Sequence, residues 1–323
     1  NYMGNKNFLI LGIFLVVALI IFFSNSPEEV IDKIAGKKLP GFDTDTTKTS
    51  IDIDLILSGG PGKDDIPALS NPKFTSIEGA SLKDKAFGVL VNMDGEKRYY
   101  PYNIMVWHEI VNDSIGDNDF AVTFCPLCGS AIVIDRNVGG QILDFGVSGY
   151  LYESNLLMYD RQTESLWSQA RGEAVVGDYV GSKLQVLDMQ LISFLELKQK
   201  HNDALVLSQD TGHSRDYSFY PYDNYESSDN LYFPVSVSDN RFSAKEVMYS
   251  FSLDDQYISF PQEGLQENGV ETLNLNGYSV SAQRDGDEIV VINNGQKVPG
   301  YYEMWFSWAT HHQNDGIVWE MNE

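Results

Sequence analysis

The sequence predicts a mainly β protein, of the β-rich α+β kind, that follows an N-terminal transmembrane helix. Short runs of strand-forming residues recur along the chain, and clusters of Gly, Asn and Asp separate them, which is typical of β-sheet domains. Two stretches repeat the same order of motifs, which predicts an internal duplication of a β-rich unit with short helices. The 323 residues suffice for one large core or two smaller ones.

Each expected strand is a run of β-branched, aromatic and aliphatic residues that ends at a turn signal. These runs cover residues 87–93, 120–124, 131–134, 142–147, 174–176, 205–208, 246–252 and 288–292. Only two segments show helical periodicity, residues 102–112 and residues 191–200. In the first, Ile104, Trp107 and His108 lie on one face, at the spacing of an amphipathic helix.

The two related stretches begin at Gly88 and at Met248. Each contains a strand, an acidic turn and a second strand that ends in an aromatic–Pro pair, at Pro101 in one case and at Pro261 in the other. Each closes on a similar helical segment, and these segments are residues 194–206 and 306–318. The shared order of motifs favours a duplicated unit over a chance likeness between aromatic–Pro strands.

The predicted organisation has four parts. They are a signal anchor over residues 1–25, a stalk and lead-in segment over 26–64, a first β-rich unit over 65–235, and a diverged second unit over 236–323 that packs on the first. The first unit contains both cysteines of the chain, and it carries an insertion at residues 149–188. A special site is therefore expected in the first unit only.

The N-terminal segment contains an apolar run. Residues 8–23 are apolar apart from Gly12, and Lys6 precedes them. At about 1.5 Å per residue this run is slightly short for the roughly 30 Å hydrocarbon core of a bilayer. Two interpretations stay open, an uncleaved signal anchor and a signal peptide that is cut near Ser26. We favour the anchor, so we expect membrane attachment with the soluble part on the extracytoplasmic side.

The charge balance is strongly acidic. The chain has 46 acidic and 22 basic side chains, which gives a formal net charge of -24. Such a charge repels nucleic acid and anionic lipid headgroups, so we expect no nucleic-acid partner. The partners that we expect are the membrane, through the N-terminal helix, and other membrane or cell-surface proteins.

The two cysteines stand in the run Cys125-Pro-Leu-Cys128-Gly129, a C-P-x-C-G pattern that is typical of metal-binding knuckles. In such a turn, backbone N–H groups after the first Cys point at its sulfur, and Gly permits a positive φ. A strand is expected on either side, whereas thioredoxin-type pairs cap a helix. This context favours metal ligation. A disulfide or redox pair, the default outside the cytoplasm, and an unpaired state stay open.

A tetrahedral metal site needs four ligands, so His, Asp, Glu or Met would complete the pair. His108 is the first candidate, because it lies just before the strand that leads to Cys125. His312 and Met158 are weaker candidates. The competing interpretations are a buried structural role for His108, a core role for Met158, and a helix-end role for His312, which His201 would share.

Several motifs together resemble a known family. They are residues 59–69, 107–113, 122–130, 145–149, 157–169 and 205–212. This set resembles the widespread prokaryotic family of domain of unknown function 3179, and the resemblance covers nearly everything after the stalk. It implies no established reaction, but it implies export or membrane anchoring and gives weight to His108, Cys125 and Cys128. Residues 257–261 and 268–272 depart from the family pattern.

A second candidate constellation lies in residues 158–169. Asp160, Arg161 and Glu164 surround an expected turn, and the two carboxylates would serve general acid–base chemistry. The competing interpretation is a structural Asp–Arg network. The sequence contains no Ser-His-Asp order, phosphate-binding glycine loop, HExxH or CxxCH motif, so we expect neither a nucleotide nor haem.

The sequence therefore predicts a membrane-anchored extracytoplasmic protein with one Cys/His metal centre that holds a copper or zinc ion. Its role would be metal handling, electron transfer or service as an accessory subunit of a membrane enzyme complex. Two alternatives stay open, a thiol–disulfide oxidoreductase that uses Cys125 and Cys128 and a non-catalytic scaffold. The sequence does not decide whether the protein is an enzyme.

Overall fold

The structure is a computed structural model that describes residues 39–275 and 278–319. The predicted signal anchor and the first part of the predicted stalk lie outside the described residues. Over the described part of the chain, no helix is long and apolar enough to cross a membrane.

The fold is β-rich with short helices, as the sequence predicts, and most of its strands belong to four sheets. The largest sheet has the spatial order β2 (Leu69–Ser70), β6 (Ile110–Ile115), β7 (Asn118–Cys125), β8 (Ser130–Asp135), β23 (Gly300–Met304), β17 (Val247–Leu253), β18 (Gln256–Pro261) and β24 (Gly316–Val318). A second sheet has the order β15 (Gln190–Ser193), β4 (Phe87–Met93), β5 (Glu96–Pro101), β16 (Leu205–Leu207) and β3 (Phe74–Thr75).

The other two sheets and one small ribbon complete the β structure. The third sheet has the order β1 (Ile56–Ser58), β11 (Phe145–Tyr152), β12 (Asn155–Asp160), β13 (Leu166–Ser168) and β14 (Glu173–Val176). The fourth has the order β19 (Val270–Leu275), β20 (Tyr278–Asp285), β21 (Glu288–Asn293) and β22 (Gln296–Val298). The ribbon pairs β9 (Asn137–Val138) with β10 (Gln141–Ile142).

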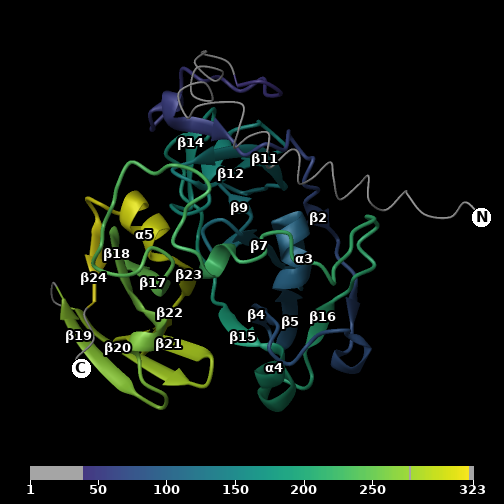
Figure 1. Cartoon of the computed structure of the whole chain (residues 1–323), viewed down its shortest axis with the longest axis vertical. Coiled ribbons are helices and arrows are strands. Elements are labelled where there is room, and N and C mark those ends of the chain that lie inside the picture. Colours follow the sequence, from purple (N-terminus) through teal and green to yellow (C-terminus); the bar gives the residue numbers. More distant parts are fainter. Residues whose placement is uncertain (1–38, 276–277, 320–323) are drawn as a thin grey trace, which may run out of the picture.

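The helices are all short. The α-helices of the described residues are α3 (Tyr102–His108), α4 (Phe194–Lys200) and α5 (Trp305–His311), and the 3-10 turns are η1 (Ile53–Leu55), η2 (Ile77–Gly79), η3 (Tyr225–Ser227) and η4 (Gln262–Gly264). Figure 1 shows the sheet of β11, β12 and β14 at one end of the long axis and the sheet of β19–β21 at the other. β7 lies between these ends.

The same strand arrangement occurs twice. β4 and β5 form a hairpin between antiparallel β15 and parallel β16, and β17 and β18 form a hairpin between β23 and β24 in the same way. α4 connects β15 to β16, and α5 connects β23 to β24. The register also agrees, because Gly88 pairs with Pro101 as Met248 pairs with Pro261. The two stretches that are related in sequence therefore fold alike.

The two arrangements are joined by one strand pair and by one buried side chain. β8, from the first, pairs with β23, from the second, through Ala131 and Tyr302. In return, Gln190 in β15 bonds to β21. Its side-chain amide donates to the Ile289 carbonyl at 3.0 Å, and its side-chain oxygen accepts the Ile289 N–H at 2.9 Å. Both residues are buried, so these bonds link the two halves inside the core.

The first predicted helix is shorter than expected. It was predicted over residues 102–112, but α3 ends at His108, because Glu109 has a φ of 58° that an α-helix cannot contain. From Ile110 onward the chain pairs with β7, so β-sheet hydrogen bonds replace the last helical turn.

The predicted stalk and insertion also differ from expectation. The described part of the stalk packs on the fold, since Leu39 and Phe42 are buried and β1 pairs with β11. The segment predicted as an insertion forms most of a separate sheet, β11 to β14, which starts slightly earlier, at Phe145. Polar composition hid this packing, because a few buried apolar side chains suffice to anchor the segment.

We expect the Gln190→Ala substitution to lower the free energy of unfolding by about 2–4 kcal/mol, because it leaves the Ile289 N–H and carbonyl buried without partners. Urea unfolding followed by circular dichroism measures this. Gln141→Ala, at an exposed position, is the matched control and should change stability by less than about 0.5 kcal/mol. An equally small effect at Gln190 would show that the two halves do not depend on this contact.

Candidate functional site

The cysteines lie in the turn between β7 and β8. Cys125 ends β7 and pairs with Ser130, and the Cys128 N–H donates to the Cys125 carbonyl at 3.2 Å. Gly129 has a φ of 55°, and a Cβ there would lie 3.1 Å from the Met304 side chain. Gly is therefore required both by conformation and by space. The strand–knuckle–strand context that the sequence predicts is present.

Both thiols are free and buried, with 2% of Cys125 and 0% of Cys128 exposed. Burial alone would raise the pKa of Cys125. The Cys128 thiol and the backbone N–H groups of Leu156, Cys128 and Leu127 outweigh it by bonding to the Cys125 sulfur, so the pKa of Cys125 falls below its usual value. The surroundings of Cys125 thus favour its thiolate more than those of an ordinary thiol do.

Cys128 is affected in the opposite direction. Burial and the neighbouring Cys125 sulfur raise its pKa well above the usual value, and Ser307 and Asn155 offset only part of this. Its Sγ also donates to the Ser154 carbonyl at 3.2 Å. Cys128 therefore keeps its proton, which two acceptors share, the Ser154 oxygen and the Cys125 sulfur.

Two buried carboxyl groups stand near the thiols. Burial, and then the charge of Cys125, raise the pKa of Glu109 well above its usual value and the pKa of Glu303 to about 8. Ser307 lies close enough to Glu303 to lower its pKa, against the larger effect of burial, yet neither carboxyl oxygen has a hydrogen bond of normal geometry. Glu303 is fully buried, so it is protonated over most of the physiological pH range.

A network of buried polar side chains packs against the turn that carries the cysteines. The Gln169 side-chain oxygen accepts from Ser130 Oγ at 2.6 Å and from Asn155 Nδ2 at 3.1 Å, and its amide donates to Thr123 Oγ1 at 3.1 Å. All four residues are buried. Because Asn155 also acts on Cys128, the network fixes the position of the second thiol.

A long segment covers the thiols from the other side. We call residues 208–246, which connect β16 to β17, the cover segment; η3 is its only regular element. Tyr225 belongs to the same buried cluster as both cysteines, and Tyr222 and Phe233 pack against that cluster. Lys245 Nζ lies 3.4 Å from the centre of the Tyr225 ring and holds it in place. Both sulfurs are buried, and this segment supplies part of the apolar cluster around them.

His108 does not join the cysteines as the sequence analysis expected. Its Nδ1 lies 2.7 Å from the Pro67 carbonyl, which can only accept, so Nδ1 carries the proton and donates. Nε2 then accepts from the Tyr217 hydroxyl at 2.7 Å, and Tyr217 in turn accepts from Thr211 Oγ1 at 2.6 Å. Both ring nitrogens are used, and His108 ties the start of the cover segment to α3.

The weaker ligand candidates lie in different surroundings. His312 is the C-cap of α5, as His201 is of α4, and its Nδ1 lies 3.1 Å from Asp315 Oδ1. Met158, in β12, belongs to the buried cluster of the two cysteines. Across residues 39–275 and 278–319, no group of three or more His, Cys, Asp or Glu side chains is placed so that it could hold a metal ion.

The candidate acid–base residues each have a structural partner. Asp160 is fully buried; its Oδ1 accepts the Thr163 N–H at 2.6 Å, and its Oδ2 accepts the Trp167 indole N–H at 2.9 Å. Arg161 forms two bonds of 2.8 Å to Asp64, and Glu164 pairs with Lys63. These contacts close the turn and dock the lead-in segment, which matches the structural interpretation of this constellation.

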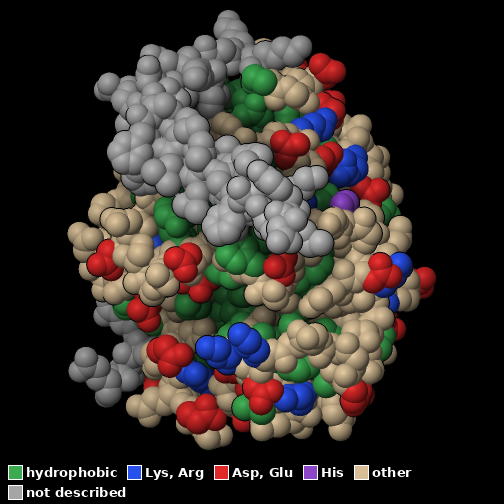
Figure 2. All heavy atoms as spheres, turned by 45° about the vertical axis from the view of Figure 1, so that its right-hand side comes forward, with side chains coloured by type: hydrophobic (Ala, Val, Ile, Leu, Met, Phe, Trp, Pro, Cys, Tyr) green, Lys and Arg blue, Asp and Glu red, His purple; other side chains and the backbone are tan. Residues whose placement is uncertain are grey.

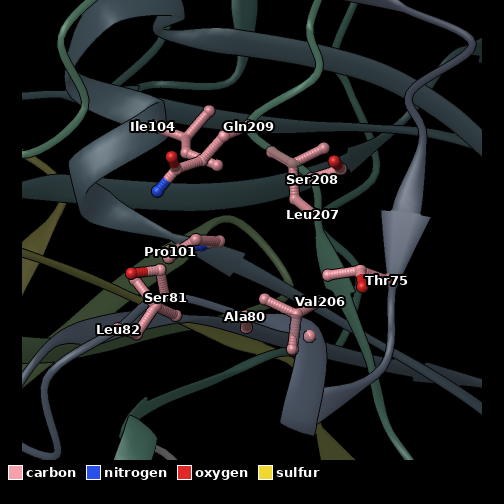
Figure 3. A pocket seen from close by; sticks show the side chains of 11 residues that line it. Thr75, Ala80, Ser81, Leu82, Pro101, Ile104, Val206, Leu207, Ser208 and Gln209 are labelled. Carbon is pink, nitrogen blue, oxygen red and sulfur yellow. The ribbon is translucent and has the colours of Figure 1, made fainter.

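Two hollows of the described surface have neither cysteine in their lining. Figure 3 shows one of about 150 Å³, lined by Thr75, Ser81, Gln209 and apolar neighbours, without a titratable side chain. A second, of about 390 Å³, is lined by Arg171 and by residues near the end of α5, and also by Glu153 and Ser236. On the face in Figure 2, acidic side chains are scattered among basic and apolar ones rather than gathered in one patch.

Sequence reasoning missed three parts of this site, Glu109, Glu303 and Tyr225. Glu109 directly follows His108 in a motif that had been noted, so its position was a usable signal. Glu303 comes from the other half of the chain, and only the pairing of β8 with β23 brings it to the thiols. Tyr225 lies in a polar stretch without periodicity, which gives no sign of burial.

The fold and the site define a β-rich protein with a buried dithiol in a strand–turn–strand knuckle. The chain belongs to the family described as Protein of unknown function (DUF3179), whose family model matches residues 63–300, and this confirms the family that the motifs indicated. No curated protein and no solved structure matches the chain. The matched span contains both cysteines and the whole cover segment, and it ends just before Glu303.

We expect His108 to make folding stability depend on pH. Burial, together with the charges of His213 and Arg215, lowers the pKa of His108 from 6.5 to about 4, against the bond to Pro67. The unfolded chain therefore binds a proton between these values that the folded chain does not, so stability should fall as pH drops from 6.5 towards 4. His108→Gln should flatten this part of the curve in urea unfolding. Gln141→Ala, at an exposed position and without a titratable group, is the control; parallel curves for His108→Gln and the unsubstituted protein would contradict the assignment.

Proposed function

We propose that Cys125 and Cys128 form a thiol–disulfide redox centre. The observation that carries this proposal is the contrast between two neighbouring thiols. Cys125 lies where backbone N–H groups favour its thiolate, and Cys128 lies where burial keeps its proton bound. An attacking thiolate beside a protonated partner thiol is the arrangement that thiol–disulfide exchange uses.

The exchange takes two steps. The Cys125 thiolate attacks one sulfur of a substrate disulfide, forms a mixed disulfide and releases the other substrate sulfur as a thiolate. Cys128 then loses its proton and attacks the Cys125 sulfur, which forms the Cys125–Cys128 disulfide and releases the second substrate sulfur. The released thiolate takes up the Cys128 proton. The protein loses two electrons, and the substrate disulfide becomes one thiol and one thiolate.

The contacts of Cys125 also bear on the direction of the reaction. Hydrogen bonds to its thiolate stabilise the reduced protein, and a stabilised reduced form makes the corresponding disulfide a stronger oxidant. The two steps above therefore also run in reverse, with the protein disulfide oxidising a substrate dithiol. We therefore expect a reduction potential less negative than about −300 mV, the range of structural disulfides.

We expect the two thiols to react with iodoacetamide over separate pH ranges. In the Cys128→Ser variant, alkylation of Cys125 should be half-maximal below pH 9.0, the usual thiol pKa, because backbone N–H groups stabilise its thiolate. In the Cys125→Ser variant, Cys128 should react only above that pH. Mass spectrometry of quenched time points gives both profiles. The reverse order, or a pair that oxidised glutathione fails to join reversibly, would overturn the proposal.

We expect movement of the cover segment to limit the rate of alkylation in the same experiment. Tyr225→Ala should speed alkylation tenfold or more, because removal of a buried aromatic ring costs about 3–5 kcal/mol and ~1.4 kcal/mol corresponds to tenfold. Phe219→Ala, in the same segment but 54% exposed, is the matched control and should leave the rate unchanged. Equal rates for both variants would place the barrier elsewhere.

A second candidate function is metal binding by the same pair, and the knuckle geometry favours it. Backbone N–H groups after Cys125 point at its sulfur, as in metal-binding knuckles. Zinc needs four ligands, whereas soft Cu(I) accepts thiolates at low coordination number, and Met158 would add a soft neighbour. This candidate keeps the predicted copper centre but holds it with Cys125 and Cys128, because both nitrogens of His108 are engaged.

We expect any bound copper to depend on the cysteines and not on His108. Protein purified without chelators or histidine tags is loaded with Cu(I), desalted and analysed by mass spectrometry of the metal. Cys125→Ser should abolish stoichiometric copper, and His108→Gln should retain it. Loss of copper in His108→Gln would instead support the Cys/His metal centre predicted from the sequence. Substoichiometric copper and zinc in the unsubstituted protein would rule out metal binding by the pair. If the thiols also failed to exchange with disulfides, the non-catalytic scaffold would be the remaining hypothesis.

We also propose that the protein is membrane-anchored with its soluble part outside the cytoplasm, and that its two halves arose by duplication. The apolar run of residues 8–23 supports the first point, and thiol–disulfide chemistry suits such a compartment. The shared strand order and register of the two hairpins support the second.

A further inference from the structure

The turn between β11 and β12 has an unusual backbone. Glu153 and Ser154 have φ values of 50° and 67°, which residues other than Gly rarely adopt. Both are buried, with 8% and 1% exposed. Positive φ at both central residues is the usual geometry of a two-residue hairpin loop, and the pairing of Tyr152 with Asn155 sets it here. Glu and Ser are not the residues that favour this geometry, so the loop is less stable than one built from Asn and Gly.

The turn contacts the thiols on one side and the cover segment on the other. Towards the thiols, the Ser154 carbonyl accepts from Cys128 Sγ at 3.2 Å. Towards the cover segment, Ser154 Oγ donates to the Phe233 carbonyl at 3.2 Å, and Glu153 Oε2 accepts the Ser236 N–H at 2.7 Å. Two adjacent residues thus connect the Cys128 proton to the segment that shields it.

We propose that this turn makes the cover segment a redox-sensitive lid, which is closed while Cys128 carries its proton and released when Cys125 and Cys128 form a disulfide. The inference rests on the proposed redox function and adds its regulation. It names one donor, the Cys128 thiol, and one acceptor, the Ser154 carbonyl, as the sensing contact.

The chemistry of the switch follows from the balance of atoms. When the S–S bond forms, the two sulfurs give up two electrons to the substrate disulfide, and Cys128 gives up its hydrogen. The Ser154 carbonyl then has no donor, although it is buried, and leaving a buried carbonyl unpaired is costly. The turn then shifts so that the Ser154 carbonyl finds another donor or water, and this shift moves Glu153 and Ser154 Oγ away from their partners in the cover segment.

The other end of the cover segment stays attached during this change. Asn103 Nδ2 donates to the Tyr217 carbonyl at 2.9 Å, and the Tyr217 hydroxyl donates to His108. Both partners belong to α3 and neither bonds to a cysteine. On the far side of Ser236, the Asp239 carbonyl accepts from the Trp305 indole at 2.8 Å. Release therefore frees the stretch around Phe233 and Ser236, while Tyr217 and Asp239 serve as fixed points. An oxidised pair must be reduced before it acts again, and opening after oxidation admits the reductant.

Amide hydrogen exchange of the full chain tests the proposal. The reporter is the Ser236 N–H, which is hydrogen-bonded only while the turn holds it, and the Cys125 N–H region of β7 is the reference. In the protein oxidised with diamide, exchange at Ser236 should rise about tenfold, which corresponds to ~1.4 kcal/mol, and dithiothreitol should reverse it. The loss of two hydrogens in the intact mass verifies the disulfide.

Two variants at one position form the matched pair. In Cys128→Ser the hydroxyl can still donate to Ser154 and no disulfide can form, so exchange at Ser236 should stay low with and without diamide. In Cys128→Ala the donor is absent, so exchange should be high even without oxidant. If Cys128→Ala loosens the whole core, exchange in β7 rises too. Ser154→Ala then replaces it, because this substitution removes only the bond to Phe233. It should raise exchange at Ser236 and leave exchange in β7 unchanged.

The outcomes separate this inference from the redox function. A verified disulfide with unchanged exchange at Ser236 overturns the lid and leaves the redox centre standing. Failure of the disulfide to form overturns the redox centre, while high exchange in Cys128→Ala still supports the coupling between thiol and lid. Equal exchange in Cys128→Ser and Cys128→Ala overturns the coupling itself.

Discussion

The pairing of β8 with β23 is the contact on which the rest of the site depends. It joins the hairpin that carries the cysteines to the strand that leads into α5, and the Met304 N–H donates to the Cys128 carbonyl at 2.8 Å just beside it. Glu303 and Ser307 reach the thiols only through this junction. The site is therefore a product of both halves of the chain, although both cysteines come from the first.

The equivalent turn in the second half shows what the cysteine turn has in addition. β20 and β21 are joined at Gly286 and Asp287, and this turn lies at the start of α4 as the cysteine turn lies at the start of α5. There the Ser193 N–H donates to Asp287 Oδ2 at 2.9 Å, and the Asp287 N–H donates to Glu196 Oε2 at 2.7 Å. Carboxylates and amides fill that junction with structural bonds. The cysteine turn is longer and places two sulfurs in the same location.

Much of the fold could be predicted from local pattern, and the site could be predicted only in part. Strand positions and the likeness of the hairpins at Pro101 and Pro261 follow from composition and turn signals, and the knuckle follows from its own five residues. The environment of the thiols was out of reach, because it depends on long-range pairing. His108 shows the limit most clearly: proximity in sequence suggested a ligand, but a carbonyl and a hydroxyl, Pro67 and Tyr217, occupy its two nitrogens.

The isolated carboxyl group of Glu303 has a consequence for the protein as a folded object. An acid with no bonding partner in the interior lowers the free energy of unfolding, and an apolar residue of similar size would raise it. The free energy of unfolding is therefore smaller than it would be with an apolar residue at this position. Such a deficit is typical of positions where function and stability make opposite demands.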